Sequence, residues 1–257
     1  MTAKVDILGC PVDAIDALTA LEAIAAAMRT KTRLCPSLVN TAKLVRMRQD
    51  PELRRDVLAG DLILADGAGV ILAGRLMGRP LPERIAGIDL MLAVVECAAR
   101  EGFRPYLLGA RPAVVEHAAQ RLVAANPGLE LAGWRDGYFA PEDEAGIVAA
   151  INASGADCLF VALPTPMKER FLFRNRIRLD PAVIMGVGGS LDVISGQIAR
   201  APSWAQRAGL EWAFRLSQEP VRMGWRYAVT NAIFAAWLSI ALGARIAGQP
   251  FRPIARF

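Results

Sequence analysis

The chain has 257 residues, of which 54% are hydrophobic, and its 30 lysines and arginines exceed its 25 acidic residues by five. This length and apolar content suit one α/β domain, alone or with an appendage. The four cysteines are scattered without a CxxC pair, which disfavours disulfides and a metal site and predicts reduced thiols in a cytoplasmic protein. The positive charge favours an anionic partner: a nucleotide, a membrane surface or nucleic acid.

The beginning of the chain contains three aspartates and no apolar run, so we expect no signal peptide. Short apolar runs then alternate with amphipathic, alanine-rich stretches. This alternation predicts βαβ units and an α/β fold with a mostly parallel, Rossmann-like sheet and flanking helices. The predicted strands are 5–8, 34–40, 62–65, 105–109, 129–133, 158–163 and 183–187, and predicted helices include 89–100, 112–126 and 142–154.

Polar residues follow several of these strands. In parallel sheets, ligands bind beyond the carboxyl ends of the strands. We therefore expect one site along this edge, formed by the segments "VNT" (39–41), "ADG" (65–67), "LLGARP" (107–112) and "GVGGS" (186–190).

Four residues, three in these segments and one in the following loop, are candidates for chemistry. Asp66 follows an apolar strand in "LILADGAGV", where the sheet fixes a carboxylate and the loop exposes it, which suits a general base. The alternative is a helix N-cap or an Asx turn. Asn40 and Thr41 would line the same crevice or cap the helix that follows. Arg84, in "PERIAGIDL", could clamp a phosphate or carboxylate, or lie solvated on the surface.

Two glycine turns are candidates for binding phosphate. Gly109 and Arg111 lie between a strand and a helix whose first turn contains proline, and helix N-termini attract anions. The second turn, "GVGGS", contains Gly188, Gly189 and Ser190. Neither turn matches GxGxxG and no GK[ST] segment occurs, so we expect a mononucleotide diphosphate rather than a dinucleotide.

Several enzyme classes are disfavoured. The single histidine, His117, lies in the middle of a predicted helix, and no GxSxG, Cys/His cluster or DxD motif occurs. A glycosyl transferase that chelates a metal through DxD is therefore not expected. If a sugar is transferred, cationic side chains must balance the leaving diphosphate.

The composition changes after residue 200, and four of the five tryptophans follow this point. Arg215, Arg222 and Arg226 share one helical face if Pro220 only kinks the helix. Residues 228–243 carry no charge, but they are fewer than the ~20 that span a bilayer. We expect a core over 1–200 and a helical, membrane-associating appendage over 201–257 that lies on an anionic membrane or half enters it. The alternative is a helix packed on the core. The basic residues interleave with tryptophan rather than forming a broad hydrophilic face, so we expect no nucleic-acid partner.

The segments "DGAGV", "ERIAGIDL", "GVGGSLDV" and "RAPSW", in this order, resemble the WecG/TagA/CpsF glycosyltransferases, glycosyltransferase family 26. The resemblance covers residues 5–227. It implies inverting transfer, without a metal or other cofactor, from a UDP-sugar donor to a polyprenyl-diphosphate-linked saccharide. It also implies a peripheral enzyme on the cytoplasmic face of the inner membrane, with a tendency to form homo-oligomers.

The resemblance further implies roles for single residues. Asp66 matches the catalytic base, with Asn40, Thr41 and Arg84 in the same pocket. The C-terminal arginines Arg215, Arg222 and Arg226 match a segment that reaches over the active site and touches the membrane. The implied donor-binding residues are Gly109, Arg111, Tyr138, Lys168, Gly188, Gly189, Ser190 and Asp192.

The sequence departs from the family pattern at two places. Lys168 stands in "LPTPMKER" where the family has glutamine, and "VNTAK" replaces "VNTPN". A lysine there would suit a sugar that carries a carboxylate, such as a uronate. UDP-glucose, UDP-glucuronate, and UDP-N-acetylmannosamine or its uronate stay open as donors. The uncharged C-terminal segment favours exopolysaccharide assembly in a Gram-negative cell. The alternative function is a regulatory or scaffold protein that binds a nucleotide sugar in a polysaccharide assembly complex, without dependence on Asp66.

Overall fold

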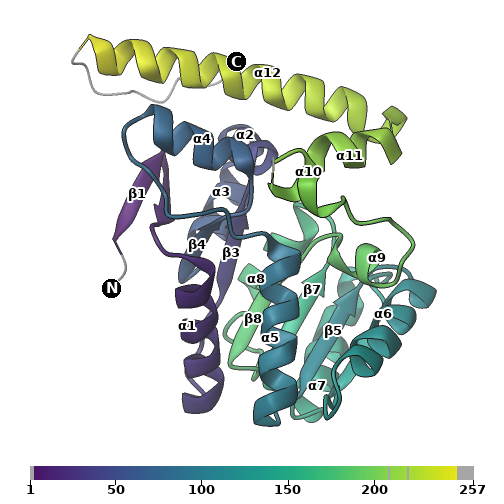
Figure 1. The fold of residues 1–257 in the computed structure, drawn as a ribbon. Coiled ribbons are helices and arrows are strands. Elements are labelled where there is room, and N and C mark those ends of the chain that lie inside the picture. Colours follow the sequence, from purple (N-terminus) through teal and green to yellow (C-terminus); the bar gives the residue numbers. More distant parts are fainter. Residues whose placement is uncertain (1–2, 208, 219, 248–257) are drawn as a thin grey trace.

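A computed structural model describes residues 3–207, 209–218 and 220–247, and the side chains at 207, 215, 220–223 and 225–227 lie outside this description. The chain forms a parallel sheet covered by helices, with a long C-terminal helix across one end (Figure 1). This is the α/β fold with flanking helices and a C-terminal helical segment that the alternating sequence pattern predicts.

Four parallel strands form the main sheet, in the order β6-β5-β7-β8. Every residue of β5, β7 and β8 is buried, which explains why these strands are continuous apolar runs rather than alternating ones. Their bounds are β5 (Pro105–Gly109), β6 (Gly133–Arg135), β7 (Cys158–Ala162) and β8 (Val183–Gly186).

A second parallel pair continues this sheet. Strands β3 (Pro36–Val39) and β4 (Leu62–Ala65) pair with each other. Just before β3, Leu34 forms a parallel bridge with Val183, in which the Leu34 N–H donates to the Ala182 carbonyl at 2.8 Å. Strand β3 therefore starts beside β8 and runs in the same direction, so the carboxyl ends of both sheets face one edge.

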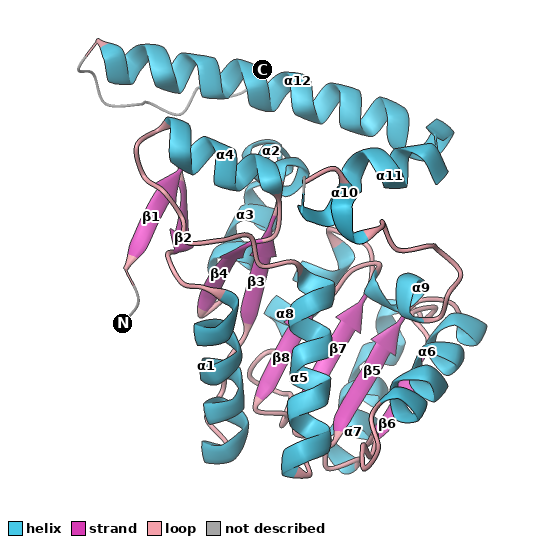
Figure 2. Cartoon of the chain, viewed as in Figure 1, coloured by secondary structure: helices cyan, strands magenta, loops and turns pink. Residues whose placement is uncertain are grey.

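Helices cover both faces of the sheet (Figure 2). Leu107 and Phe160 point to one face, into a core shared with α1, α5 and α6, whereas Leu108 and Val161 point to the other, against α7 and α8. These are α1 (Ala17–Thr30), α5 (Gly87–Glu101), α6 (Pro112–Ala125), α7 (Glu144–Ala153) and α8 (Met167–Asn175). The remaining helices before the C-terminal region are α2 (Thr41–Gln49), α3 (Pro51–Leu58), α4 (Ala68–Leu76), a 3-10 turn η1 (Pro141–Asp143) and α9 (Ser190–Ile194).

The strand predictions hold except at two places. The predicted strand 129–133 is wrong, because Leu129 packs into the core and pairing starts only where the Ala132 N–H donates to the Pro105 carbonyl at 2.8 Å. An antiparallel pair, β1 (Lys4–Ile7) and β2 (Cys10–Asp13), includes a strand that we did not predict. The four cysteines are free thiols.

The C-terminal region forms α10 (Ser203–Arg207), α11 (Glu211–Gln218) and α12 (Pro220–Ile246). Pro220 begins α12 instead of kinking one longer helix, because proline lacks an N–H and suits a first helical turn. Arg215 therefore lies on a different helix from Arg222 and Arg226, and the predicted single face for the three is wrong.

One face of α12 packs on the body of the protein beside α2 and α4. Phe234, Trp237, Leu238 and Ala241 are buried there, and the guanidinium of Arg48 on α2 lies 4.2 Å from the centre of the Trp237 ring. The alternative of packing on the core is thus confirmed for this face. The opposite face is exposed and uncharged at Ala232, Ala235, Ala236, Ser239 and Ile240. By length and composition alone, residues 228–246 could cross a membrane, although 28% of the apolar window is buried inside the protein.

Candidate active site

Asp66 lies where β4 ends, and the backbone holds it there from two sides. Its N–H donates to the Val39 carbonyl at 2.8 Å, and its Oδ1 accepts the Gly87 N–H at 3.0 Å. Gly87 is the first residue of α5, so the carboxylate lies at the positive end of that helix dipole. The N-cap of α4 is Gly67, so Asp66 does not cap the helix that follows it. The structure therefore presents a fixed, half-buried carboxylate.

Asn40 and Thr41 lie beside Asp66 because β3 and β4 end together. A Cβ placed on Gly67, the residue after Asp66, would lie 3.1 Å from the Asn40 Cβ, and one on Gly69 would lie 2.4 Å from the Thr41 Oγ1. Asn40 is the N-cap of α2, with its Oδ1 accepting the Lys43 N–H at 3.0 Å. The capping role is confirmed for Asn40, and the same position lines the edge next to Asp66.

Replacing Asn40 separates these two roles. Asn40→Ala is expected to lower the free energy of unfolding by about 1 kcal/mol, because the Lys43 N–H loses its acceptor, whereas Asn40→Asp keeps the cap. Chemical denaturation of both variants measures this difference. Equal stability of the two would contradict the capping role, and a slower Asn40→Asp enzyme with unchanged stability would show that the amide also acts on substrate.

Arg84 is not a solvated surface residue. It forms an ion pair with Glu211 on α11, and each of the two side chains is only 21% exposed. A second ion pair joins Arg200 to Asp89 on α5. Two contacts thus tie the chain after α9 to the start of α5, close to the Asp66 carboxylate.

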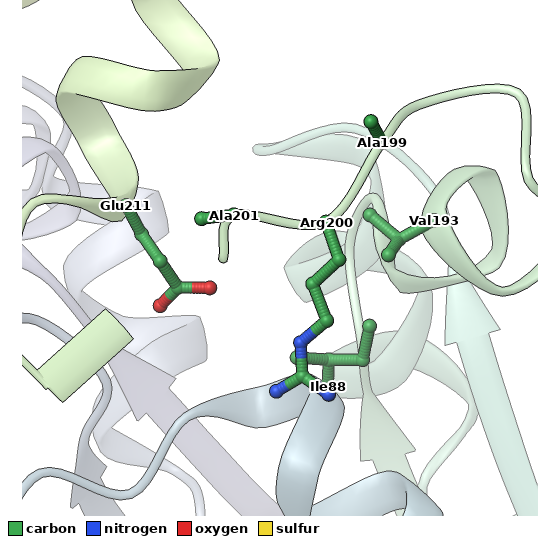
Figure 3. A pocket seen from close by; sticks show the side chains of 6 residues that line it. All are labelled: Ile88, Val193, Ala199, Arg200, Ala201 and Glu211. Carbon is green, nitrogen blue, oxygen red and sulfur yellow. The ribbon is translucent and has the colours of Figure 1, made fainter. Parts of the chain in front are cut away.

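A small pocket lies between these two segments (Figure 3). The Glu211 carboxylate lies on one side and the Arg200 guanidinium on the other, with the start of α5 below them (Figure 3). Its lining residues are Ile88, Val193, Ala199, Arg200, Ala201 and Glu211. Both signs of charge face this space, next to the N-terminus of α5.

A buried cluster of charges lies beyond β7, on α2 and α8. The Glu169 Oε1 has Lys43 Nζ at 2.9 Å and Lys168 Nζ at 3.4 Å, and it accepts the Thr165 hydroxyl at 3.1 Å. Burial raises the pKa of Glu169, but the charges of Lys43 and Lys168 outweigh this effect and lower it to about 2. Glu169 is therefore an anion at any physiological pH.

Lys168 lies at the carboxyl edge within reach of the second glycine turn. Burial, followed by the charge of Lys43, lowers its pKa to about 8, against the opposing effects of Glu169 and Asp66. A Cβ on Gly186 would lie 2.6 Å from the Lys168 Cδ, so only glycine leaves room for the lysine stem. A Cβ on Gly188 would lie 3.6 Å from its Nζ. The ammonium thus reaches the turn predicted to hold phosphate.

Within this turn, Ser190 has a structural role. Its hydroxyl donates to the Val187 carbonyl at 2.7 Å, and its N–H donates to the same oxygen at 3.3 Å. Both groups are thus used within the turn, and the predicted role of Ser190 in donor binding stays a prediction. Gly188 has a φ of +56°, which favours glycine, and Asp192 lies beside Gly189 at the start of α9.

The other predicted donor residues lie farther along the edge. Gly109 ends β5. A Cβ added at this position would lie 2.5 Å from the Ala162 carbonyl carbon, so the β5 turn packs closely against the backbone of β7. Arg111 donates to the Gln197 side chain at 2.5 Å. Tyr138 is 71% exposed on a loop whose Gly137 N–H donates to the Ala110 carbonyl at 2.9 Å. In strand order, β7, β8 and β3 separate this group from Asp66.

The predicted residues thus fall into two groups, with Lys168 and Gly188 between them. Our sequence analysis missed Lys43, Glu169, Glu211 and Arg200. The buried pair of Lys43 and Glu169 could have been suspected from the charges in "VNTAK" and "MKER", which lie next to predicted strand ends. Helices α11 and α12 carry Arg215, Arg222 and Arg226, whose side chains lie outside the described part of the structure. Among the described residues, no three His, Cys, Asp or Glu side chains gather as a metal site.

A parallel α/β sheet with a fixed carboxylate, a buried lysine and a glycine turn at its carboxyl edge defines an enzyme suited to an anionic substrate. The chain belongs to the WecG/TagA/CpsF family of glycosyl transferases, whose model matches residues 5–247. Two curated relatives are both named N-acetylglucosaminyldiphosphoundecaprenol N-acetyl-β-D-mannosaminyltransferase. The protein of Bacillus spizizenii is 39% identical over 178 residues, covering 69% of this chain and 68% of the relative. That of Bacillus subtilis is 38% identical over 168 residues, covering 65% of each chain.

Proposed function

We propose that the protein is an inverting, metal-independent glycosyltransferase that moves a sugar from a UDP-sugar to a polyprenyl-diphosphate-linked saccharide. The observation that carries this proposal is the Asp66 carboxylate, fixed by the Gly87 N–H and within electrostatic reach of the buried Lys168. The names of the relatives, which describe mannosaminyl transfer to a lipid-linked diphosphate, support a lipid-linked acceptor.

In the proposed reaction, Asp66 accepts the proton of the acceptor hydroxyl. The hydroxyl oxygen attacks the anomeric carbon from the face opposite UDP, and the bond from that carbon to the diphosphate oxygen breaks. Its electron pair leaves with UDP, so a single displacement inverts the anomeric centre. The Gly87 N–H holds one carboxylate oxygen, which orients Asp66 before the acceptor arrives.

Positive groups along the edge would balance the charge that grows on the diphosphate. The candidates are Arg84, on the Asp66 side, and the N–H groups of Gly188 and Gly189 beside Lys168. Arg215, Arg222 and Arg226 could approach from α11 and α12. Preorganised donors of this kind stabilise a developing anion because they need no reorganisation during the reaction. They support transfer without a metal.

A lipid-linked acceptor places the enzyme at a membrane, and we propose peripheral binding on the cytoplasmic face of the inner membrane. The uncharged outer face of α12 supports this, as do Trp204 and Trp212, which are 62% and 43% exposed on α10 and α11. Exopolysaccharide or cell-surface glycan synthesis is the proposed setting. Homo-oligomers remain a proposal from the family resemblance.

Calorimetry and a transfer assay test this function together. UDP, UDP-glucose, UDP-glucuronate and UDP-N-acetylmannosamine are titrated with Mg²⁺ or with EDTA, and labelled sugar is followed onto a short-chain polyprenyl-diphosphate saccharide. We expect one UDP-sugar to bind and be transferred equally well in both buffers. His117→Ala, on the exposed side of α6, is the control and should change neither readout. Binding of a nucleotide sugar without transfer would instead favour a regulatory or scaffold protein.

A further inference from the structure

Lys168 is a buried cation whose position the backbone dictates. Its side chain is 8% exposed, and its stem lies directly on Gly186 in β8. The missing Cβ of Gly186 lets the stem pass and brings the ammonium next to Gly188, at the carboxyl edge of the sheet. Burying a lysine is costly unless its charge is balanced. Among the described residues, the carboxylate that pairs with this charge is Glu169, which it shares with Lys43.

Protein contacts balance Lys168 less well than its neighbour Lys43. Lys43 Nζ donates to the Leu38 carbonyl at 2.6 Å and lies 2.9 Å from the Glu169 Oε1, which are good hydrogen-bond lengths. Lys168 Nζ shares the same carboxylate oxygen at 3.4 Å, longer than a charge-assisted hydrogen bond. An ammonium carries three donors, and this contact does not saturate them.

We propose that Lys168 binds an oxyanion of the donor's diphosphate beside Gly188 and stabilises the negative charge that develops on it as UDP leaves. This proposal rests on the proposed function. The chemistry that recognises the ammonium is an oxyanion, which a diphosphate or a carboxylate on the transferred sugar could supply. The position of Nζ against the glycine turn favours the diphosphate. Lys168 is then a catalytic cation, and Lys43 and Glu169 position it.

This role makes donor binding depend on pH. The charged groups facing the Lys168 amine are Lys43 on α2, Glu169 on α8 and Asp66 after β4. Because the pKa of Lys168 is lowered to about 8, the amine loses its charge as the pH rises through that value, and a bound oxyanion opposes the loss. The affinity of the wild-type protein for UDP should therefore fall by about tenfold between pH 7 and pH 9.

The test compares Lys168→Met with Lys31→Met, using uridine, UDP and UDP-glucuronate as probes in calorimetry. Lys168→Met keeps the stem on Gly186 and removes the charge, so we expect UDP to bind about tenfold to a hundredfold more weakly, with uridine unchanged. Lys31→Met removes a lysine that pairs with Asp157, just before β7 at the end of the sheet opposite the carboxyl edge, and should leave the UDP affinity within a few-fold of wild type.

The outcomes separate this proposal from the proposed function. Unchanged UDP affinity in a folded Lys168→Met protein overturns it, and so does a loss confined to UDP-glucuronate, which would assign the lysine to a sugar carboxylate. Should Lys168→Met not fold, a UDP affinity of the wild type that is flat from pH 7 to 9 overturns it equally. A wild-type protein that binds UDP but transfers no sugar contradicts the proposed function and leaves the Lys168 contact standing.

Discussion

Asp66→Asn is expected to slow sugar transfer by a factor on the order of 10²–10⁴, the usual effect of losing a general base. Asparagine cannot take the proton of the acceptor hydroxyl at neutral pH, yet its amide oxygen can still accept the Gly87 N–H. The fold and the affinity for the donor should therefore remain. Initial rates of transfer, together with donor titration by calorimetry, measure the two effects separately.

Asp61→Asn is the matched control for Asp66. Asp61 lies just before the other end of β4 and accepts the Cys35 N–H at 2.8 Å, far from the carboxyl edge of the strand. The Asp61→Asn enzyme should therefore transfer sugar at the wild-type rate. An Asp66→Asn enzyme that binds the donor and works at near-wild-type speed would remove Asp66 from the mechanism.

Glu169→Gln is expected to lower the free energy of unfolding by about 3–5 kcal/mol, because it leaves two lysines buried without their counter-charge. Urea denaturation at pH 7 measures the loss. Glu52→Gln is the control: Glu52 also pairs with an arginine, but its side chain is 64% exposed, and its loss should cost less than about 1 kcal/mol. Equal stability of the two variants would show that the buried cluster does not stabilise the fold.

The same cluster predicts how wild-type stability depends on pH. The pKa of Glu169 is lowered to about 2 in the folded protein, from an ordinary value near 4.5. Its ionised form therefore stabilises the fold fully above about pH 4.5, and this stabilisation is lost as the pH falls toward 2. Glu169→Gln lacks this component, so its stability should vary less across that range.

The central sheet could be predicted because burial on both faces leaves a clear mark in the sequence. Strands such as β7 are apolar at every residue, and glycine or polar residues follow them directly. Strand β2 has no such mark, since it is short and contains Pro11, which suits an edge strand but equally a loop. The apolar run before β6 misled the prediction because core packing and strand pairing favour the same side chains.

The place of Asp66 at the carboxyl edge could be predicted from its position after a strand, but its partners could not. The hydrogen bond to Gly87 spans 21 residues and the ion pair from Arg84 to Glu211 spans 127, so only the folded chain shows them. The orientation of α12 was ambiguous for a different reason. Its inner stripe of Phe234, Trp237, Leu238 and Ala241 follows helical spacing, but the outer face is also uncharged, so composition does not separate them.

The inner stripe of α12 has a consequence for how the enzyme can be dissected. Those four side chains belong to the same buried cluster as Val70 and Ile71 of α4. The last helix is therefore part of the hydrophobic core and not only a membrane anchor that could be removed. Cutting the chain before Pro220 would open the interior to water, and loss of activity would then report collapse rather than detachment from lipid. Substitutions that test membrane binding by this helix must therefore leave the inner stripe unchanged and alter only exposed positions, such as Ala232, Ala236 and Ile240.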